Sequence, residues 1–189
     1  MSSDGILQIK KDSYDFANIL FSGNCNRHCP FCIGKKLPDT INVNNLNVYP
    51  LNNQDAFLNI LKETETNNIV LTGTISDPQL YKFELRLIEE IKSRLPDSKI
   101  SLHTNGALAL RKMNEFNSYD KACISFPSFE KKTYNAMMGS EKIPDIEKIL
   151  AKSRIEIKIS SIITEHNVHE IDNFIARLNS LGIKRLVLR

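Results

Sequence analysis

Short apolar runs alternate along the chain with longer segments whose apolar residues recur at helical spacing. The runs predict strands at residues 17–22, 68–72, 99–103, 121–126, 156–163 and 184–189. Strands joined by helices run parallel, and units of roughly 30 residues are typical of βαβ repeats. The pattern therefore predicts an α/β fold, either an open doubly wound sheet or a sheet that curls into a partial or complete barrel.

The segments between the strands predict the helices and their ends. Asp77 is placed to cap a helix that begins at Pro78 and runs to Leu95. Asn167 and Glu170 have the spacing of a capping box before a further helix. The long polar stretch 37–53 predicts a loop with an extended piece at 41–48. The helix after it is expected to bury Ala56, Phe57, Ile60 and Leu61.

Length and charge narrow the classes of partner. The chain has 189 residues, so we expect a single domain over 1–189. A net charge of +3 without long basic runs gives no reason to expect a nucleic acid or a membrane surface as partner. No apolar stretch reaches the ~18–20 residues of a membrane span, and the polar start does not resemble a secretory signal. These features predict a cytoplasmic protein with reduced thiols.

Three of the four cysteines crowd into one short segment. Cys25, Cys29 and Cys32 form the pattern C-x3-C-x2-C directly after the first predicted strand. Thiolates at such spacing bind iron or zinc. Gly23 and Pro30 disfavour a continuous helix that would make these residues ordinary core positions. A zinc site with His28 as fourth ligand stays open as an alternative. Cys123 lies within a predicted strand, where we expect a buried, inert thiol.

With an aromatic residue before its last cysteine, this segment resembles the signature of the radical S-adenosylmethionine superfamily. The resemblance implies a partial (β/α)6 barrel, a three-quarter TIM barrel of parallel strands. It also implies a 4Fe–4S cluster on Cys25, Cys29 and Cys32. The fourth iron would bind the amino and carboxylate groups of S-adenosylmethionine, because three protein ligands leave one position open.

The resemblance extends to the ends of the later strands and implies further cofactor-binding residues. Thr72-Gly73-Thr74, followed by Asp77, is similar to the family's Gly-Gly-Glu-Pro segment, and a plain helix cap is the alternative for Asp77. Asn105 belongs to a Thr-Asn-Gly sequence, and Ser125 is retained where Pro127 replaces an acid. The implied cofactor residues are Phe31, near the adenine, and Gly73, Thr74, Asp77, Asn105, Ser125 and Ser160.

The implied reaction is reductive cleavage of S-adenosylmethionine, after which a 5′-deoxyadenosyl radical takes a hydrogen atom from the substrate. The nearest likeness is to enzymes that modify peptides or build cofactors, so we expect a peptide or small-molecule substrate. Expected partners are an electron donor, such as flavodoxin or ferredoxin, and a partner chain that closes the barrel if the chain is not a fragment. A structural zinc protein and an electron-transfer module remain as alternatives.

Overall fold

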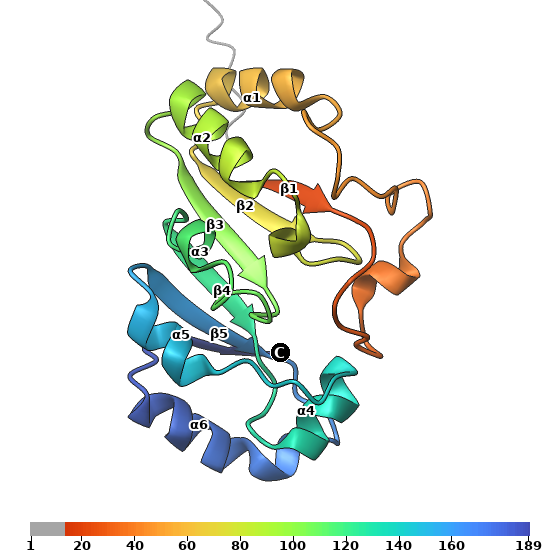
Figure 1. The fold of residues 1–189 in the computed structure, drawn as a ribbon, viewed down its shortest axis with the longest axis vertical. Helices are drawn as coiled ribbons and strands as arrows, with labels where there is room; N and C mark the ends of the chain where they lie inside the picture. The colour runs from red at the N-terminus through yellow and green to blue at the C-terminus, as the bar shows by residue number, and fades with distance from the viewer. Residues whose placement is uncertain (1–13) are drawn as a thin grey trace, which may run out of the picture.

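The predicted strands form one parallel sheet whose spatial order is the order of the chain (Figure 1). The computed structural model describes residues 14–189. Its strands are β1 (Ala17–Phe21), β2 (Asn68–Gly73), β3 (Lys99–Thr104), β4 (Lys121–Ser125), β5 (Glu156–Ser161) and β6 (Leu186–Leu188). A doubly wound sheet reverses its strand order near the middle, whereas this sheet does not. The expected partial barrel of parallel strands is confirmed.

The connections between the strands hold six α-helices and three short 3-10 turns within the described residues. The helices are α1 (Gln54–Glu63), α2 (Glu84–Arg94), α3 (Met113–Phe116), α4 (Lys131–Met138), α5 (Ile146–Lys152) and α6 (Ile171–Ser180). The 3-10 turns are η1 (Ile33–Lys36), η2 (Pro78–Leu80) and η3 (Val168–Glu170). Within residues 14–189, no helix combines the length and apolar character that crossing a membrane requires.

Two helix starts differ from the prediction. Asp77 caps only the short turn η2, and the chain leaves helical geometry before α2 begins at Glu84. The Asn167 side chain does not cap a helix, so the predicted capping box is absent. Its amide nitrogen instead donates to the carbonyls of Pro127 and Ile162, at 3.2 and 2.9 Å. Contacts between distant segments therefore outweigh the local capping preference.

In the N-terminal half one prediction is confirmed and one is partly wrong. Residues 37–53 form a loop, as predicted, and the piece at 41–48 does not join the sheet as a strand. Instead, the Asn45 side chain bonds to the Leu20 carbonyl and the Ser22 amide at the open edge of β1. Helix α1 buries Leu58 and Leu61, whereas Ile60 is 52% exposed. The apolar residues chosen from the sequence thus lie partly on the solvent side of this helix.

The strands bury alternate residues against the helices. Ile69, Leu71, Ile100, Leu102, Ile124 and Ile159 are all 0% exposed. Their neighbours along each strand point to the other, concave face, because successive strand residues point to opposite sides. In Figure 1 the strands end on the side of the sheet that faces the loop after β1 and helix α4. Polar residues at those strand ends therefore meet at one place.

Candidate active site

The cysteine segment is a loop that is pressed against the end of β2. Cys25, Cys29 and Cys32 precede η1, and the Cys32 amide donates to the Cys29 carbonyl at 3.3 Å. A Cβ at Gly34 would lie 2.2 Å from the Thr74 carbonyl oxygen, so only glycine permits this approach. The loop is also held by Asn42, whose amide donates to the Gly34 carbonyl at 2.8 Å. Local backbone geometry thus fixes where the three thiols lie.

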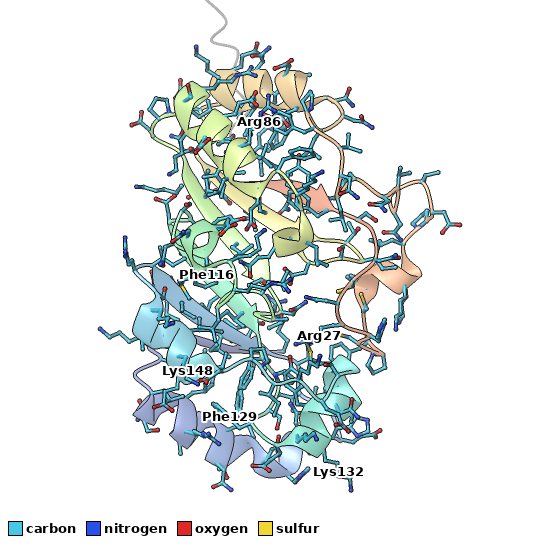
Figure 2. The ribbon with its side chains drawn as sticks, viewed as in Figure 1. Arg27, Arg86, Phe116, Phe129, Lys132 and Lys148 are labelled. Carbon is cyan, nitrogen blue, oxygen red and sulfur yellow. The ribbon has the colours of Figure 1, made fainter. Side chains whose placement is uncertain are left out.

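Helix α4 holds the other side of the cysteine loop. The His28 amide donates to the Met138 carbonyl at 3.0 Å, and Gly139 follows in left-handed conformation. Figure 2 shows Arg27 between the cysteine loop and α4. Its guanidinium donates to Tyr134 Oη at 3.2 Å and to the Lys142 carbonyl at 2.8 Å. These contacts join the loop to a helix more than 100 residues later in the chain.

All three thiols of the loop face one cavity of about 870 Å³. Cys29 Sγ lies 3.7 Å from Met138 Sδ, and Cys32 Sγ lies 3.9 Å from the Thr74 carbonyl oxygen. Burial raises the pKa of Cys29 to about 11, and the neighbouring cysteines add to the rise. Burial likewise raises the pKa of Cys25. Without a bound metal Cys25 and Cys29 favour the protonated form, and a cationic centre would convert them to thiolates.

The donor set fits an iron–sulfur cluster. Within residues 14–189, no three His, Cys, Asp or Glu side chains converge as ligands of a single metal ion would. All three cysteines line the same cavity. Soft thiolate ligands suit iron–sulfur clusters, whose iron atoms are spread over several positions.

The cofactor residues predicted from the later strands line the same cavity. All seven lie there with the three cysteines: Phe31, Gly73, Thr74, Asp77, Asn105, Ser125 and Ser160. They come from the cysteine loop and from the ends of β2, β3, β4 and β5. The structure thus brings together residues that lie up to 135 positions apart in the chain. Their individual roles toward a cofactor stay predictions.

Asp77 joins the ends of β2 and β3. Its carboxylate accepts from the Gln79 backbone N–H at 3.0 Å, from Thr104 Oγ1 at 2.9 Å and from the Asn105 backbone N–H at 2.7 Å. The side chain is 3% exposed, and burial raises its pKa. Asp77 therefore caps the turn η2 and also binds donors at the end of β3, and its contact with a cofactor stays a prediction. By holding the Asn105 backbone, Asp77 also orients the Asn105 side chain, whose Nδ2 donates to Asn26 Oδ1 at 2.8 Å.

The sequence reasoning missed several residues of the cavity. Thr104 shares the Asp77 carboxylate, and Arg27 and Met138 support the cysteine loop. Arg27 lies inside the cysteine motif between Cys25 and Cys29, and no sequence signal connected it to Tyr134. Cys123 is buried as predicted, but it also lines the cavity, together with His103.

A partial barrel of parallel strands that carries three cysteines in the loop after β1 is typical of the core domain of radical enzymes. The family model described as the radical SAM superfamily matches residues 19–188, and the chain belongs to this superfamily. A comparison with curated proteins finds no match.

Solved structures share the fold at low sequence identity. SuiB of Streptococcus suis, solved with bound S-adenosylmethionine, has a TM-score of 0.69 and 18% identity, and the match covers 93% of this chain and 39% of SuiB. The protein anSMEcpe with bound AdoMet has a TM-score of 0.65 and 17% identity over 92% of this chain and 52% of its own. HemN of Escherichia coli has a TM-score of 0.54 and 15% identity over 92% of this chain and 42% of its own. The chain thus spans about half of these proteins or less.

Proposed function

We propose that the chain binds a 4Fe–4S cluster and S-adenosylmethionine and cleaves the latter reductively to start radical chemistry on a substrate. The observation that carries this proposal is the cavity that the three thiols share with Phe31 of the cysteine loop and six residues at the strand ends. Membership of the radical SAM superfamily supports the same reaction class. The cavity volume, about 870 Å³, lies in the range of small-molecule sites.

In this proposal Cys25, Cys29 and Cys32 hold three irons, and the fourth position is left for S-adenosylmethionine. The cluster, when bound, supplies one electron, taken from a donor such as flavodoxin or ferredoxin, to cleave the C5′–S bond. The chain itself supplies binding, orientation and exclusion of water. Phe31 is suited to pack against the adenine, and the backbone at Gly73 and Thr74 is suited to the amino group.

Polar residues from three strand ends are suited to hold the rest of S-adenosylmethionine. Ser125 and Ser160 are paired in register on β4 and β5, so their hydroxyls lie side by side at the cavity. Asn105 supplies an amide from the end of β3. We assign Asp77 a positioning role, because three donors of the chain already occupy its carboxylate. It keeps Asn105 in place and does not need to touch the cofactor.

The substrate class follows from the family only in broad terms. We propose a peptide or a small molecule. SuiB has been solved with its precursor peptide SuiA, at 15% identity to this chain, which supports a peptide. HemN, described as a coproporphyrinogen III oxidase, supports a small molecule equally.

The decisive test is the formation of 5′-deoxyadenosine. The protein is purified without oxygen, reconstituted with iron and sulfide, reduced with dithionite and mixed with S-adenosylmethionine, and the product is separated by chromatography. We expect product from the natural chain and none from Cys29→Ala. Equal product from both would refute the assignment of the cysteines, and cluster binding without any product would refute the cleavage.

The zinc alternative is tested by the metal itself. A four-ligand zinc site needs His28, so His28→Ala would lose its metal if zinc were the resident ion. We expect His28→Ala to retain iron at the level of the natural chain, because three cysteines suffice for the cluster. Zinc in place of iron in the anaerobically purified protein would contradict the proposal.

A further inference from the structure

A second set of reactive side chains lies in one row across the concave face of the sheet. The strand register pairs His103 on β3 with Cys123 on β4, and Cys123 with Lys158 on β5. Paired residues of parallel strands point to the same side, so the three side chains are neighbours. Each lies two residues before a strand-end residue of the cavity, Asn105, Ser125 and Ser160 in turn. Of this row, which we call the floor, His103 and Cys123 line the cavity and Lys158 is the register neighbour of Cys123.

This floor is positively charged. Arg189 lines the cavity beside His103 and Cys123. Burial lowers the pKa of His103, and the charges of Lys158, Arg189 and Lys121 lower it further, so the imidazole is neutral at neutral pH. Neither Lys158 nor Arg189 forms a salt bridge with any residue of 14–189.

The carboxylates near the floor are already engaged. Among the described residues that line the cavity, Asp77 is the only acid, and its oxygens accept from Gln79, Thr104 and Asn105. Glu156 lies on the concave face of β5 and is bonded to Arg185 at 3.1 Å. No acidic side chain of residues 14–189 is thus paired with Lys158 or Arg189.

The floor is electrostatically separate from the cysteine loop. The charged groups that act on the Cys25 and Cys29 thiols are the other cysteines, Asp77 and Lys35. Those that act on Cys123 are Lys158 and Arg189. Lys35 is a cation of the loop itself and donates to the Cys29 carbonyl at 2.7 Å. Lys158 and Arg189 act on Cys123 instead, so we take them as the cations available for a second anion.

We propose that this floor binds an anionic group of the substrate, a carboxylate or a phosphate, between Lys158 and Arg189 with His103 beside it. Ammonium and guanidinium groups together recognise such anions by charge-assisted hydrogen bonds. A neutral imidazole adds one further donor. This inference rests on the proposed function, because the bound anionic group would hold the substrate below the S-adenosylmethionine.

Cys123 offers a direct probe of the floor, because its thiol lies between His103 and Lys158 and lines the cavity. The cluster-loaded chain is treated at alkaline pH with iodoacetate or with iodoacetamide, and alkylation is followed by mass on the peptide that contains Cys123. In both reactions the thiolate attacks carbon and iodide leaves. The ratio of the two rates therefore cancels the thiolate fraction and reports only the preference for the anionic reagent.

We expect the ratio of iodoacetate to iodoacetamide rates at Cys123 to exceed that of glutathione by about threefold or more. Lys158→Met should bring the ratio close to that of glutathione. Lys121→Met is the matched control, because Lys121 lies on the same face one register row away and is not among the charges that shift the pKa of Cys123. This control should keep most of the preference.

Inorganic phosphate and acetate serve as competitors on the unsubstituted chain. Slower alkylation by iodoacetate with either one supports the site, and the stronger competitor identifies the anion class. An unchanged rate with both, together with a ratio equal to that of glutathione, would overturn the proposal. The readout does not need cleavage of S-adenosylmethionine. A chain that forms no 5′-deoxyadenosine but prefers iodoacetate would refute the proposed function and leave the anion site standing.

Discussion

The two faces of the sheet use the same strands for different purposes. On the face toward the helices, Leu102, Ile124 and Ile159 are fully buried and apolar. On the concave face the adjacent positions are His103, Cys123 and Lys158. The helix-facing residues supply the hydrophobic core, whereas the concave residues leave polar groups facing a cavity. The alternation along each strand therefore places core residues and cavity residues on opposite faces of the sheet.

The largest effect on stability should come from the helix-facing side. Leu102→Ala removes a side chain that is 0% exposed, so we expect the free energy of unfolding to fall by about 3 kcal/mol. Val70→Ala changes a half-buried residue on the concave face and should cost about 1 kcal/mol or less. Urea denaturation of both variants measures the difference. Equal losses would show that the concave face also belongs to the core.

The next effect concerns the carboxylate that connects β2 and β3. Asp77→Asn replaces one acceptor oxygen by an amide that faces the donors of Thr104 and Asn105. We expect a loss of about 2 kcal/mol in unfolding free energy and a clear drop in 5′-deoxyadenosine formation. Asp145→Asn is the matched control. It changes an exposed cap of α5 and should cost less than about 1 kcal/mol, with product formation unchanged.

The contact between α4 and the cysteine loop should respond to a single added methyl group. Gly139 has a φ of +61°, and a Cβ there would lie 2.7 Å from the His28 Cβ. Gly139→Ala therefore causes a steric clash with His28, and the left-handed backbone costs alanine about 1–2 kcal/mol in addition. We expect less iron per chain after reconstitution.

Gly182 provides the matched control for that variant. Its φ is +79°, but a Cβ there meets nothing within 4 Å. Gly182→Ala should show the strain alone, seen as a lower unfolding midpoint with iron content retained. Iron loss of equal size in both variants would mean that the effect arises from general destabilisation and not from the loop.

Much of the fold could be predicted because each strand carries its own apolar run. The cysteine loop, the strand ends and the parallel order follow from local patterns of this kind. The failures are of another kind. The Asn167 side chain donates to the Pro127 carbonyl and does not cap a helix, and Asp77 accepts from Asn105 at the end of the next strand. Such partners depend on contacts between distant segments, which no local pattern contains.

The cavity floor could not be predicted for the same reason. His103, Cys123 and Lys158 are separated by 20 and 35 positions, and only the register of β3, β4 and β5 places them in one row. In the sequence each is an isolated residue within a strand. A shift of one residue in any pairing would turn its side chain toward the helices. The row can therefore be recognised only when the register of the sheet is known.

The smallest expected effect is on the titration of His103, and it tests the charge of the concave face directly. Because burial and the nearby cations lower the pKa of His103 below 6.5, its folded-state value lies under that of the unfolded chain. The stability that the neutral imidazole contributes is thus present above pH 6.5 and is lost as the pH falls through the lowered pKa.

Nuclear magnetic resonance of the imidazole protons measures the pKa of His103. Lys158→Met removes one repelling charge and should raise the pKa of His103, because the imidazolium becomes less unfavourable. Lys148→Met changes an exposed lysine on α5 that is not among the charges acting on His103, and should leave its pKa unchanged. A pKa of His103 that does not respond to Lys158→Met would mean that Lys158 points away from the row, and the two faces would then differ in packing but not in charge.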